Sequence, residues 1–492
     1  MALALSALLC LASGFLLVSL GWRNGAAASS KEGANYVLAA SLSVGFGLGM
    51  FSVVFFLCLL LGGAHLILID VGVCAVLLVS FLGFRARTPL TVPIRERSLD
   101  QLGWLPRVLT IAFAIALCAA IYSAIMRMLA YPHGEGWDAF SIWNLHARFL
   151  FRGGLNWRDG FTPLLPWSHP DYPLLLPGAA AHFWSYLGHD SPAVPAIIGL
   201  LFTFSTVGLL FSALSILRGR TAAMLAATAL LATPSFIEQG TSQYADVPLS
   251  FFILATLALI GLHDDHTQDD SSKRTPGLLA LAGLAAACGA WTKNEGLLFL
   301  CAIVAARGFT LLRGETSAEN WSARLRQLAP LLVATVPALL LIAYFKRFIA
   351  PPGDLFSDPT TTLHKLLDPA RYWAIIRWYF KGFFRFGRWL LIPGSLLLIA
   401  FYFAAGKEDR PQPRSGIRTS ALALALTLAG YFAVYLITPY DIYWHLRFSL
   451  TRLFLQLWPS AIFLIFLMVK SGSIADNRAH SERLDNHLNV SK

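Results

Sequence analysis

The sequence predicts an all-α protein that crosses a membrane many times. Of its 492 residues, 56% are hydrophobic and only 13% are charged, whereas soluble proteins carry about 45–50% apolar and about 25% charged residues. The apolar residues form long runs, and about 20 in a row can cross a bilayer as a helix. These observations exclude a soluble enzyme, a disordered protein and a nucleic-acid-binding domain. We attribute the net charge of +11 to loop orientation and to contact with anionic lipid or phosphate.

We expect a bundle of about 13 transmembrane helices. The first apolar run has no basic residues before it, so we interpret it as a membrane helix and not as a signal peptide. Asp70 lies deep in the third run, has only His65 as a polar neighbour there, and receives no functional assignment. Segment 172–187 is either a short span or a helix near the membrane surface. The candidate spans are residues 2–20, 36–62, 64–83, 108–130, 192–216, 221–239, 246–262, 277–292, 296–312, 327–345, 389–405, 419–437 and 453–470.

Lys and Arg residues between the spans predict the orientation, because cytoplasmic loops carry an excess of them. Two long segments, 131–191 and 346–388, then lie outside the cell, and the second is basic. The acidic run from Asp264 to Asp270 falls on the cytoplasmic side and is interpreted as a solvated loop. The basic loops placed in the cytoplasm lie within residues 85–107, 218–220, 307–326 and 407–418.

The chain divides into three parts on this topology. Residues 1–107 form an N-terminal unit of three spans with a cytoplasmic basic loop. Residues 108–470 form the transmembrane domain with the candidate site, and residues 471–492 form a polar cytoplasmic tail. No internal repeat and no soluble appended domain are evident.

The first long outer segment carries a carboxylate at the membrane surface. Asp138 lies in Gly-Glu-Gly-Trp-Asp, directly after a span, which suits a general base. The alternative is that it caps a helix over Ala139–Phe151, and Glu135 is the neighbouring candidate base. His169 and Asp171 follow in Trp-Ser-His-Pro-Asp-Tyr-Pro. They either support the site or shape the turn before an apolar helix.

Two short outer connections also carry charges. Asp246 lies in Tyr-Ala-Asp-Val-Pro-Leu between two spans, and it is either a helix cap or a site residue. Lys293 and Glu295 lie in Thr-Lys-Asn-Glu-Gly. Ionisable groups at membrane depth are costly and usually functional, although these two could simply neutralise each other. Asp138, Asp246 and His169 could together hold a divalent metal ion, but no unambiguous metal cage is evident.

Basic residues late in the chain form two further groups. Four of them are spaced by four, four and three residues, so they share one face of a helix over residues 372–390. This pattern is typical of an interfacial helix that anchors to lipid headgroups or binds a specific phosphate. Arg447 and Arg452 open the last span, and their faces differ by about 140° if the chain is helical there. The residues with helical spacing are Arg377, Lys381, Arg385 and Arg388.

The order of these motifs resembles the GT-C superfamily of integral-membrane glycosyltransferases. It is most similar to bacterial enzymes related to the dolichyl-phosphate-mannose–protein mannosyltransferase family and to the aminoarabinose transferases. The resemblance covers residues 108–470 and implies a GT-C-like bundle with a long first catalytic outer loop. It matches Asp138, Asp246 and Lys293 to the acidic and basic positions of the family. The sequence departs from the family pattern at Ala139 and Asp171, so acceptor contacts are expected to differ.

The resemblance implies transfer of a sugar from a polyprenyl-phosphate donor to a lipid, glycan or protein acceptor, with inversion, at the extracytoplasmic face of a bacterial inner or plasma membrane. Asp138 and Asp246 are the catalytic candidates. Glu135, His169, Asp171 and Glu295 are acceptor-binding or supporting candidates. The candidates for binding the donor phosphate, whose negative charge grows as it leaves, are Lys293, Arg447, Arg452, Arg377 and Arg388.

Two other functions stay open at this point. A transporter or lipid flippase would place paired charges at mid-membrane, often within inverted repeats. An O-antigen-type polysaccharide ligase or polymerase would use a large basic outer loop late in the chain, which segment 346–388 partly resembles. The sequence names neither the sugar nor the acceptor, and it implies no nucleic-acid partner and no certain cofactor.

Overall fold

The computed structural model describes most of the chain. The described residues are 2–22, 32–63, 65–85, 104–269, 275–313, 326–353, 355, 359–387, 394–405 and 414–469. The expected tail from residue 471 and most of the basic loop between residues 85 and 107 lie outside these ranges.

Helices make up nearly all of the described structure. The first part of the chain contains α1 (Ala2–Gly21), α2 (Glu32–Leu60), α3 (Leu66–Arg85), α4 (Trp104–Ala130), the π-helix η2 (Ala139–Trp143), α5 (Asn144–Arg152), the 3₁₀ helices η3 (Gly154–Phe161) and η4 (Pro166–Ser168), and α6 (Leu175–Leu187). The second part contains α7 (Ala193–Leu217), α8 (Arg220–Leu231), α9 (Pro234–Thr241), α10 (Asp246–Asp269), α11 (Pro276–Thr292), α12 (Asn294–Leu312), α14 (Ala329–Phe348), α15 (Pro359–Leu367), α16 (Pro369–Phe383), α17 (Gly394–Ala405), α18 (Arg414–Ile437) and α19 (Ile442–Met468).

The helices confirm an all-α polytopic membrane protein. Among the described residues, 10 helices are long and apolar enough to cross a membrane, and α8 with α9, bent by 66°, brings the number to 11. Two shorter apolar helices, α11 and α17, occupy the other two ranges that hydropathy predicted. The last span was predicted to begin at residue 453, whereas α19 begins at Ile442.

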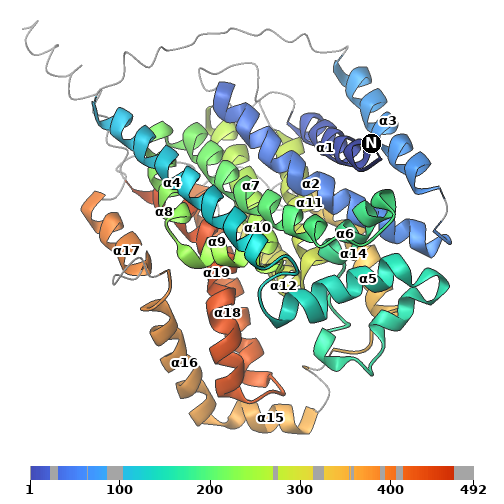
Figure 1. Cartoon of the computed structure of the whole chain (residues 1–492). Coiled ribbons are helices and arrows are strands. Elements are labelled where there is room, and N and C mark those ends of the chain that lie inside the picture. Colours follow the sequence, from blue (N-terminus) through green and yellow to red (C-terminus); the bar gives the residue numbers. More distant parts are fainter. Residues whose placement is uncertain are drawn as a thin grey trace, which may run out of the picture.

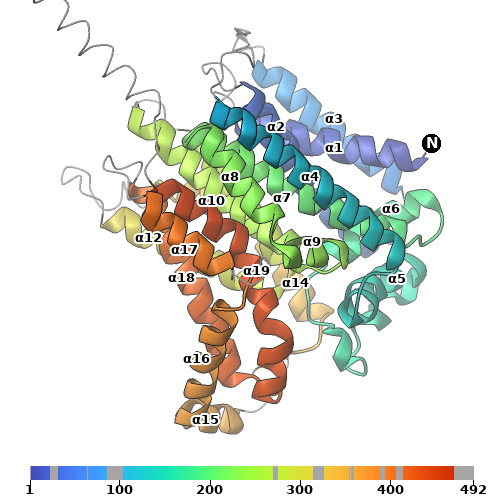
Figure 2. The ribbon, with the colours of Figure 1, turned by 60° about the vertical axis from the view of Figure 1, so that its left-hand side comes forward.

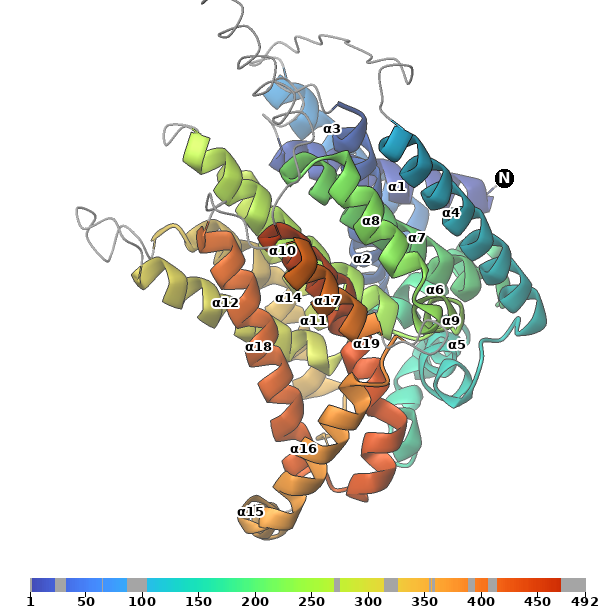
Figure 3. The ribbon, with the colours of Figure 1, turned by 90° about the vertical axis from the view of Figure 1, so that its left-hand side faces the viewer.

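The centre of the bundle is α10, whose apolar window is entirely buried. It packs mainly against α7, α11 and α19, while α12 packs against α18. In Figures 1, 2 and 3, α15, α16 and the adjoining ends of α18 and α19 project from the bundle at one end. The α5 region lies toward the same end (Figure 3). The two long connecting segments therefore meet on the side of the bundle where α10 begins.

Segment 172–187 does not make an independent span. Its helix, α6, has 13 residues, which extend about 20 Å and fall short of a hydrocarbon core of about 30 Å. Nearly every residue of α6 is buried, and the helix packs against α2 and α5. It is therefore an internal helix, enclosed by the protein.

The interpretation of the acidic run as a solvated loop is wrong for its first residue. Helix α10 continues to Asp269, and Asp264 is buried. Its carboxylate accepts two hydrogen bonds from Arg307, at 2.7 and 2.6 Å, and Arg307 also donates to Ser415 at 2.9 Å. A buried carboxylate needs such a partner, and the partner lies 43 residues further along the chain. Asp270 lies outside the described residues.

Asp70 has two partners that its own span could not reveal. Its Oδ2 atom lies 2.8 Å from Nε2 of His182 and accepts a hydrogen bond of 2.6 Å from Tyr186. Both partners belong to α6, and Asp70 and His182 have no exposed surface. This cluster fastens α3 to the helix that follows the His169–Tyr172 loop.

We predict that Asp70→Ala lowers the free energy of unfolding by about 3 kcal/mol or more, because removing one partner of a buried polar cluster leaves the others unpaired. Thermal unfolding of the purified protein in detergent measures this. Ser185→Ala is the matched control on α6: its hydroxyl only bonds to the carbonyl of Ala181, so we expect a change within about 0.5 kcal/mol. Equal stability of the Asp70 variant and the parent protein would contradict the prediction.

Candidate active site

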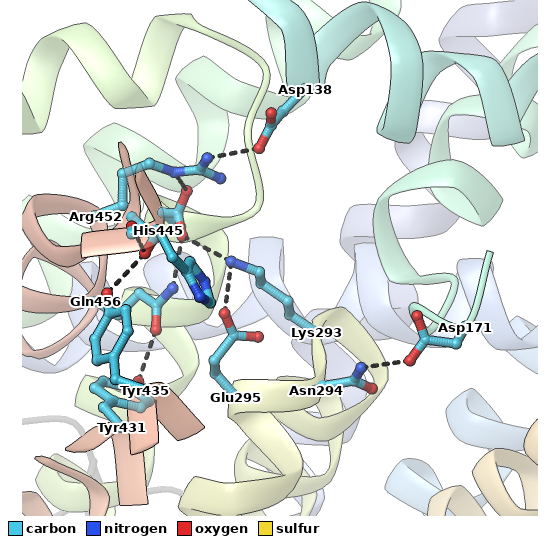
Figure 4. A network of polar contacts seen from close by, with 12 residues as sticks. Asp138, Asp171, Lys293, Asn294, Glu295, Tyr431, Tyr435, His445, Arg452 and Gln456 are labelled. Carbon is cyan, nitrogen blue, oxygen red and sulfur yellow. Dashed lines mark hydrogen bonds and ion pairs between the residues drawn. The ribbon is translucent and has the colours of Figure 1, made fainter. Parts of the chain in front are cut away.

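Asp246 is the centre of a polar network, and Figure 4 shows its partners Lys293, Arg452 and Gln456 from close by. It is the first residue of α10 and has no exposed surface. Its Oδ2 atom accepts from Nε of Arg452 at 2.8 Å. Its Oδ1 atom accepts from Gln456 at 2.6 Å and from Lys293 at 3.3 Å. Three donors therefore compensate the burial of this carboxylate.

Arg452 joins Asp246 to Asp138. Its Nη1 atom donates to Oδ2 of Asp138 at 2.6 Å, and its guanidinium lies over the ring of Tyr244, 4.6 Å from the centroid. Gln456 follows one turn later on α19, on the same face as Arg452. Tyr431 on α18 holds the Gln456 amide by donating to its oxygen at 2.6 Å. Helix α19 thus carries Arg452, which donates to both carboxylates, and Gln456, which donates to Asp246.

Asp138 does not cap a helix. Its backbone is helical, with φ −65° and ψ −33°, and its side chain makes no capping hydrogen bond. It directly precedes the π-helix η2, a type of turn that is frequent at functional sites. Gly136, with φ +89°, lets the preceding loop approach closely, because a Cβ atom there would lie 2.5 Å from the Tyr244 hydroxyl. The neighbouring candidate, Glu135, instead forms an ion pair with Arg127.

Lys293 and Glu295 do pair, as one alternative proposed, but they also belong to the network. The Lys293 ammonium lies 2.8 Å from Glu295 and 3.3 Å from Asp246. Burial alone would lower the pKa of Lys293, but the charges of Asp246 and Glu295 outweigh it and hold this pKa above its usual value. Three carboxylates and two cations share the network, so it carries an excess negative charge.

A second polar cluster adjoins the first. Asp171 accepts from Asn294 at 2.8 Å and from Lys346 at 3.1 Å, and Lys346 also donates to Asn294 at 2.9 Å. In Figure 4, Asp171 and Asn294 lie on the far side of Lys293 from Asp138. Asp171 therefore fastens the loop before α6 to the start of α12 and the end of α14.

Aromatic rings connect the two clusters. Tyr172 stacks on His169, with centroids 4.8 Å apart, and on Trp143, with centroids 5.6 Å apart. The Lys293 ammonium lies 5.8 Å from the centroid of Tyr172. Burial, followed by the charges of Glu295 and Asp171, raises the pKa of the Tyr172 phenol. His169 thus supports the loop through its ring.

The possible metal set is not assembled in this structure. Within the described ranges, no group of three His, Cys, Asp or Glu side chains is placed to hold a metal ion. Arg452 bonds to both Asp138 and Asp246, where a cation would otherwise lie between them, and His169 stacks on Tyr172. We therefore derive no chemical step through a metal.

Arg447 faces an open groove of about 480 Å³. The groove lies between α9, α16 and the outer part of α19, and its charged residues are three cations and one carboxylate: Lys381, Arg385, Arg447 and Glu238. Arg447 and Arg452 thus point to different places, as their spacing predicted. Thr451, the neighbour of Arg452, also lines the groove, so the groove and the network flank the same helix.

The predicted helical stripe of basic residues is only partly correct. Helix α16 ends at Phe383, so Arg385 lies in the following turn, and Arg388 lies outside the described residues. Arg377 is exposed on α16 and is not among the groove residues. Lys381 and Arg385, which are four residues apart, both line the groove.

Several network residues were not identified from sequence. Each is a single uncharged or basic residue in or beside an apolar helix, where snorkelling or packing is the ordinary explanation. Gln456 could have been identified from the sequence, because it follows Arg452 by four residues within an apolar span and so shares its helix face. The residues are Tyr244, Asn294, Lys346, Tyr431 and Gln456.

A comparison with protein families gives one match for this chain. Residues 193–346 match the family described as dolichyl-phosphate-mannose-protein mannosyltransferase. The matched range includes Asp246 and Lys293, whereas Asp138 and Arg452 lie outside it. No curated protein and no solved structure matches the chain significantly. The chain is thus an integral membrane protein with a region similar to this glycosyltransferase family, and its resemblance to the GT-C superfamily, family 39 type, is confirmed.

Proposed function

We propose that the protein transfers a sugar from a polyprenyl-phosphate donor to a lipid, glycan or protein acceptor at the extracytoplasmic face, with inversion. The observation that carries this proposal is the pairing of a carboxylate network with a basic groove on two sides of one helix. The family match supports sugar transfer over a transporter, a flippase or a polysaccharide ligase. A lipid-linked donor also fits a chain that lies largely within the membrane.

Asp138 is the proposed general base. Its side chain is 23% exposed, whereas that of Asp246 is fully buried, so of these two catalytic candidates only Asp138 can be reached by an acceptor hydroxyl. The carboxylate takes the hydroxyl proton, the acceptor oxygen forms a bond to the anomeric carbon, and the bond from that carbon to the phosphate oxygen breaks. The polyprenyl phosphate leaves with the bonding electrons. Asp246 acts by holding Arg452 and Lys293 in place.

The leaving phosphate is proposed to lie in the groove beside Arg447. Lys381, Arg385 and Arg447 oppose a single carboxylate there, which suits an anion. The network is less suitable, because Lys293 and Arg452 are already neutralised by three carboxylates. Exposed aromatic residues on α16 and α19, among them Phe380 and Phe448, would contact the surrounding lipid.

We predict that Asp138→Asn lowers turnover by at least ~10²-fold, because the amide keeps the shape but cannot take the proton. Turnover of purified protein with a polyprenyl-phosphate sugar measures this. Asp190→Asn is the matched control, because this carboxylate also pairs with arginines, Arg148 and Arg152, in the same outer segment. We expect it to retain turnover. A fully active Asp138→Asn protein would rule out this base and redirect attention to Glu135.

We predict that Arg447→Ala raises the donor concentration needed for half-maximal turnover by about tenfold, the effect of losing one hydrogen bond between charged groups. Arg447→Lys should restore part of the loss, since it keeps the charge without the planar fork. Arg377→Ala, outside the groove, should stay within about twofold of the parent protein. Normal donor use by Arg447→Ala together with failure of Arg377→Ala would move the phosphate to the exposed face of α16.

We predict that cysteines at Leu155 and Leu164, which are 94% and 80% exposed, react with an impermeant maleimide added to intact cells. Cysteines at Arg220 and Arg313, both exposed near the other ends of the spans, should react only after the membrane is opened. The background must lack native cysteines, because Cys118 and Cys301 are exposed. The reverse labelling pattern would put the site in the cytoplasm and remove the argument for an extracytoplasmic reaction.

A further inference from the structure

One glutamine, Gln243, adopts a backbone conformation that favours other residue types. It lies in the turn between α9 and α10, and its φ of +61° is in the left-handed region. Glycine and asparagine adopt that region most readily, because a longer L side chain is disfavoured there. Strain of this kind persists only where the surrounding structure requires it. A glutamine at this position therefore implies that its longer side chain has a role.

Both polar groups of the Gln243 side chain bind the segment that contains Asp138. The amide oxygen accepts a 2.7 Å hydrogen bond from the side-chain amide of Asn144. The amide nitrogen donates to the backbone carbonyl of Pro132 at 3.0 Å. Gln243 and Asn144 are each 4% exposed, so losing either one leaves the other with an unpaired buried group. One side chain therefore holds residues on both sides of the proposed base.

Two glycines let this segment lie directly against the turn. Gly134 has φ +86°, and a Cβ atom there would lie 2.8 Å from the carbonyl oxygen of Ser242 and 3.3 Å from Cδ of Gln243. Gly136 makes the corresponding close approach to Tyr244. Segment and turn therefore pack against each other at successive residues, without a side chain between them at these two points.

The same turn leads to the carboxylate that shares a partner with Asp138. Asp246 follows Gln243 by three residues and accepts from Nε of Arg452 at 2.8 Å. Asp138 accepts from Nη1 of the same arginine at 2.6 Å, and Tyr244 packs under its guanidinium. The relative position of the two carboxylates thus depends on how the segment of Asp138 docks on the turn, and the Gln243 amide fastens this docking.

We infer that Gln243 is a positioning residue for Asp138, because its amide fixes the proposed base relative to the network of Asp246. The inference rests on the proposed function and adds to it an uncharged residue that takes no part in proton transfer. A reacting group that is displaced by about 1 Å can lose about 10²-fold in rate. Loss of the amide should therefore act on the chemical step.

The test is Gln243→Asn in the purified full-length protein, with turnover measured against the concentration of a polyprenyl-phosphate sugar. Asparagine suits the left-handed backbone, but its amide is one methylene too short to hold both partners. We expect kcat to fall at least about tenfold, since the base is displaced. The donor concentration for half-maximal turnover should stay within about twofold, because Gln243 does not line the groove proposed for the phosphate.

Gln239→Asn is the matched control for this change. It shortens the nearby glutamine on α9 by the same methylene, and the amide oxygen of Gln239 accepts no hydrogen bond within the described part of the chain. We expect its kcat to stay within about twofold of the parent protein, as for most substitutions that break no specific contact.

A double-mutant comparison separates positioning from a general loss of structure. If Gln243 acts through Asp138, Gln243→Asn should lower the residual turnover of Asp138→Asn by less than about twofold, because a base that is absent cannot be misplaced. A merely structural role would lower turnover by the same factor in both backgrounds and would lower the folded fraction in thermal unfolding. Asn144→Ala breaks the same hydrogen bond from the other side, and it decides the question if Gln243→Asn does not fold.

Failure of the inference differs from failure of the proposed function. Full turnover by Gln243→Asn, or a loss of the same factor with and without Asp138, would overturn the inference alone, provided that Asp138→Asn is inactive. If Asp138→Asn turns over normally, or if the parent protein transfers no sugar from a polyprenyl-phosphate donor, the proposed function is wrong and the inference falls with it.

Discussion

The structure depends on keeping a negative charge, that of Asp246, buried at the end of its central helix. Moving an ion out of water costs several kcal/mol even after the protein relaxes, and this carboxylate has no exposed surface. Three donors compensate it, from Arg452 and Gln456 on α19 and from Lys293 between α11 and α12. The need to satisfy one carboxylate therefore fixes the relative positions of α10, α12 and α19.

The same constraint separates two regions of opposite charge. Because Arg452 and Lys293 are used to compensate carboxylates, the network has no cation left over for an anionic ligand. The cations that remain available lie on another side of α19, in the groove with Arg447 and Lys381. The five-residue spacing of Arg447 and Arg452 turns them about 140° apart on the helix. One helix can thus present one arginine to the carboxylate network and another to the groove.

Hydropathy was sufficient to predict the helices, because a span must be apolar over most of its length. It could not predict that Asp70 and Asp264 are satisfied, since their partners lie 112 and 43 residues away. The site motifs identified Asp138, Asp246 and Lys293, whose charges are conspicuous between apolar runs. They did not identify Gln456 or Asn294, because one polar residue in an apolar helix has no periodic pattern. The basic stripe is only partly formed, because α16 ends at Phe383 and Arg377 is not among the groove residues.

Rigidity is unevenly distributed around the proposed site, and this matters for how it could work. Helices α10 and α12 are joined near both ends, by Asp246 with Lys293 and by Asp264 with Arg307. These two joints are separated by 18 residues on α10, or about 27 Å of helix. Rotation of α10 against α12 would break a buried ion pair at one end or the other. The Asp138–Arg452 ion pair is held less firmly, because its side chains are 23% and 19% exposed and solvent-accessible ion pairs contribute less than buried ones.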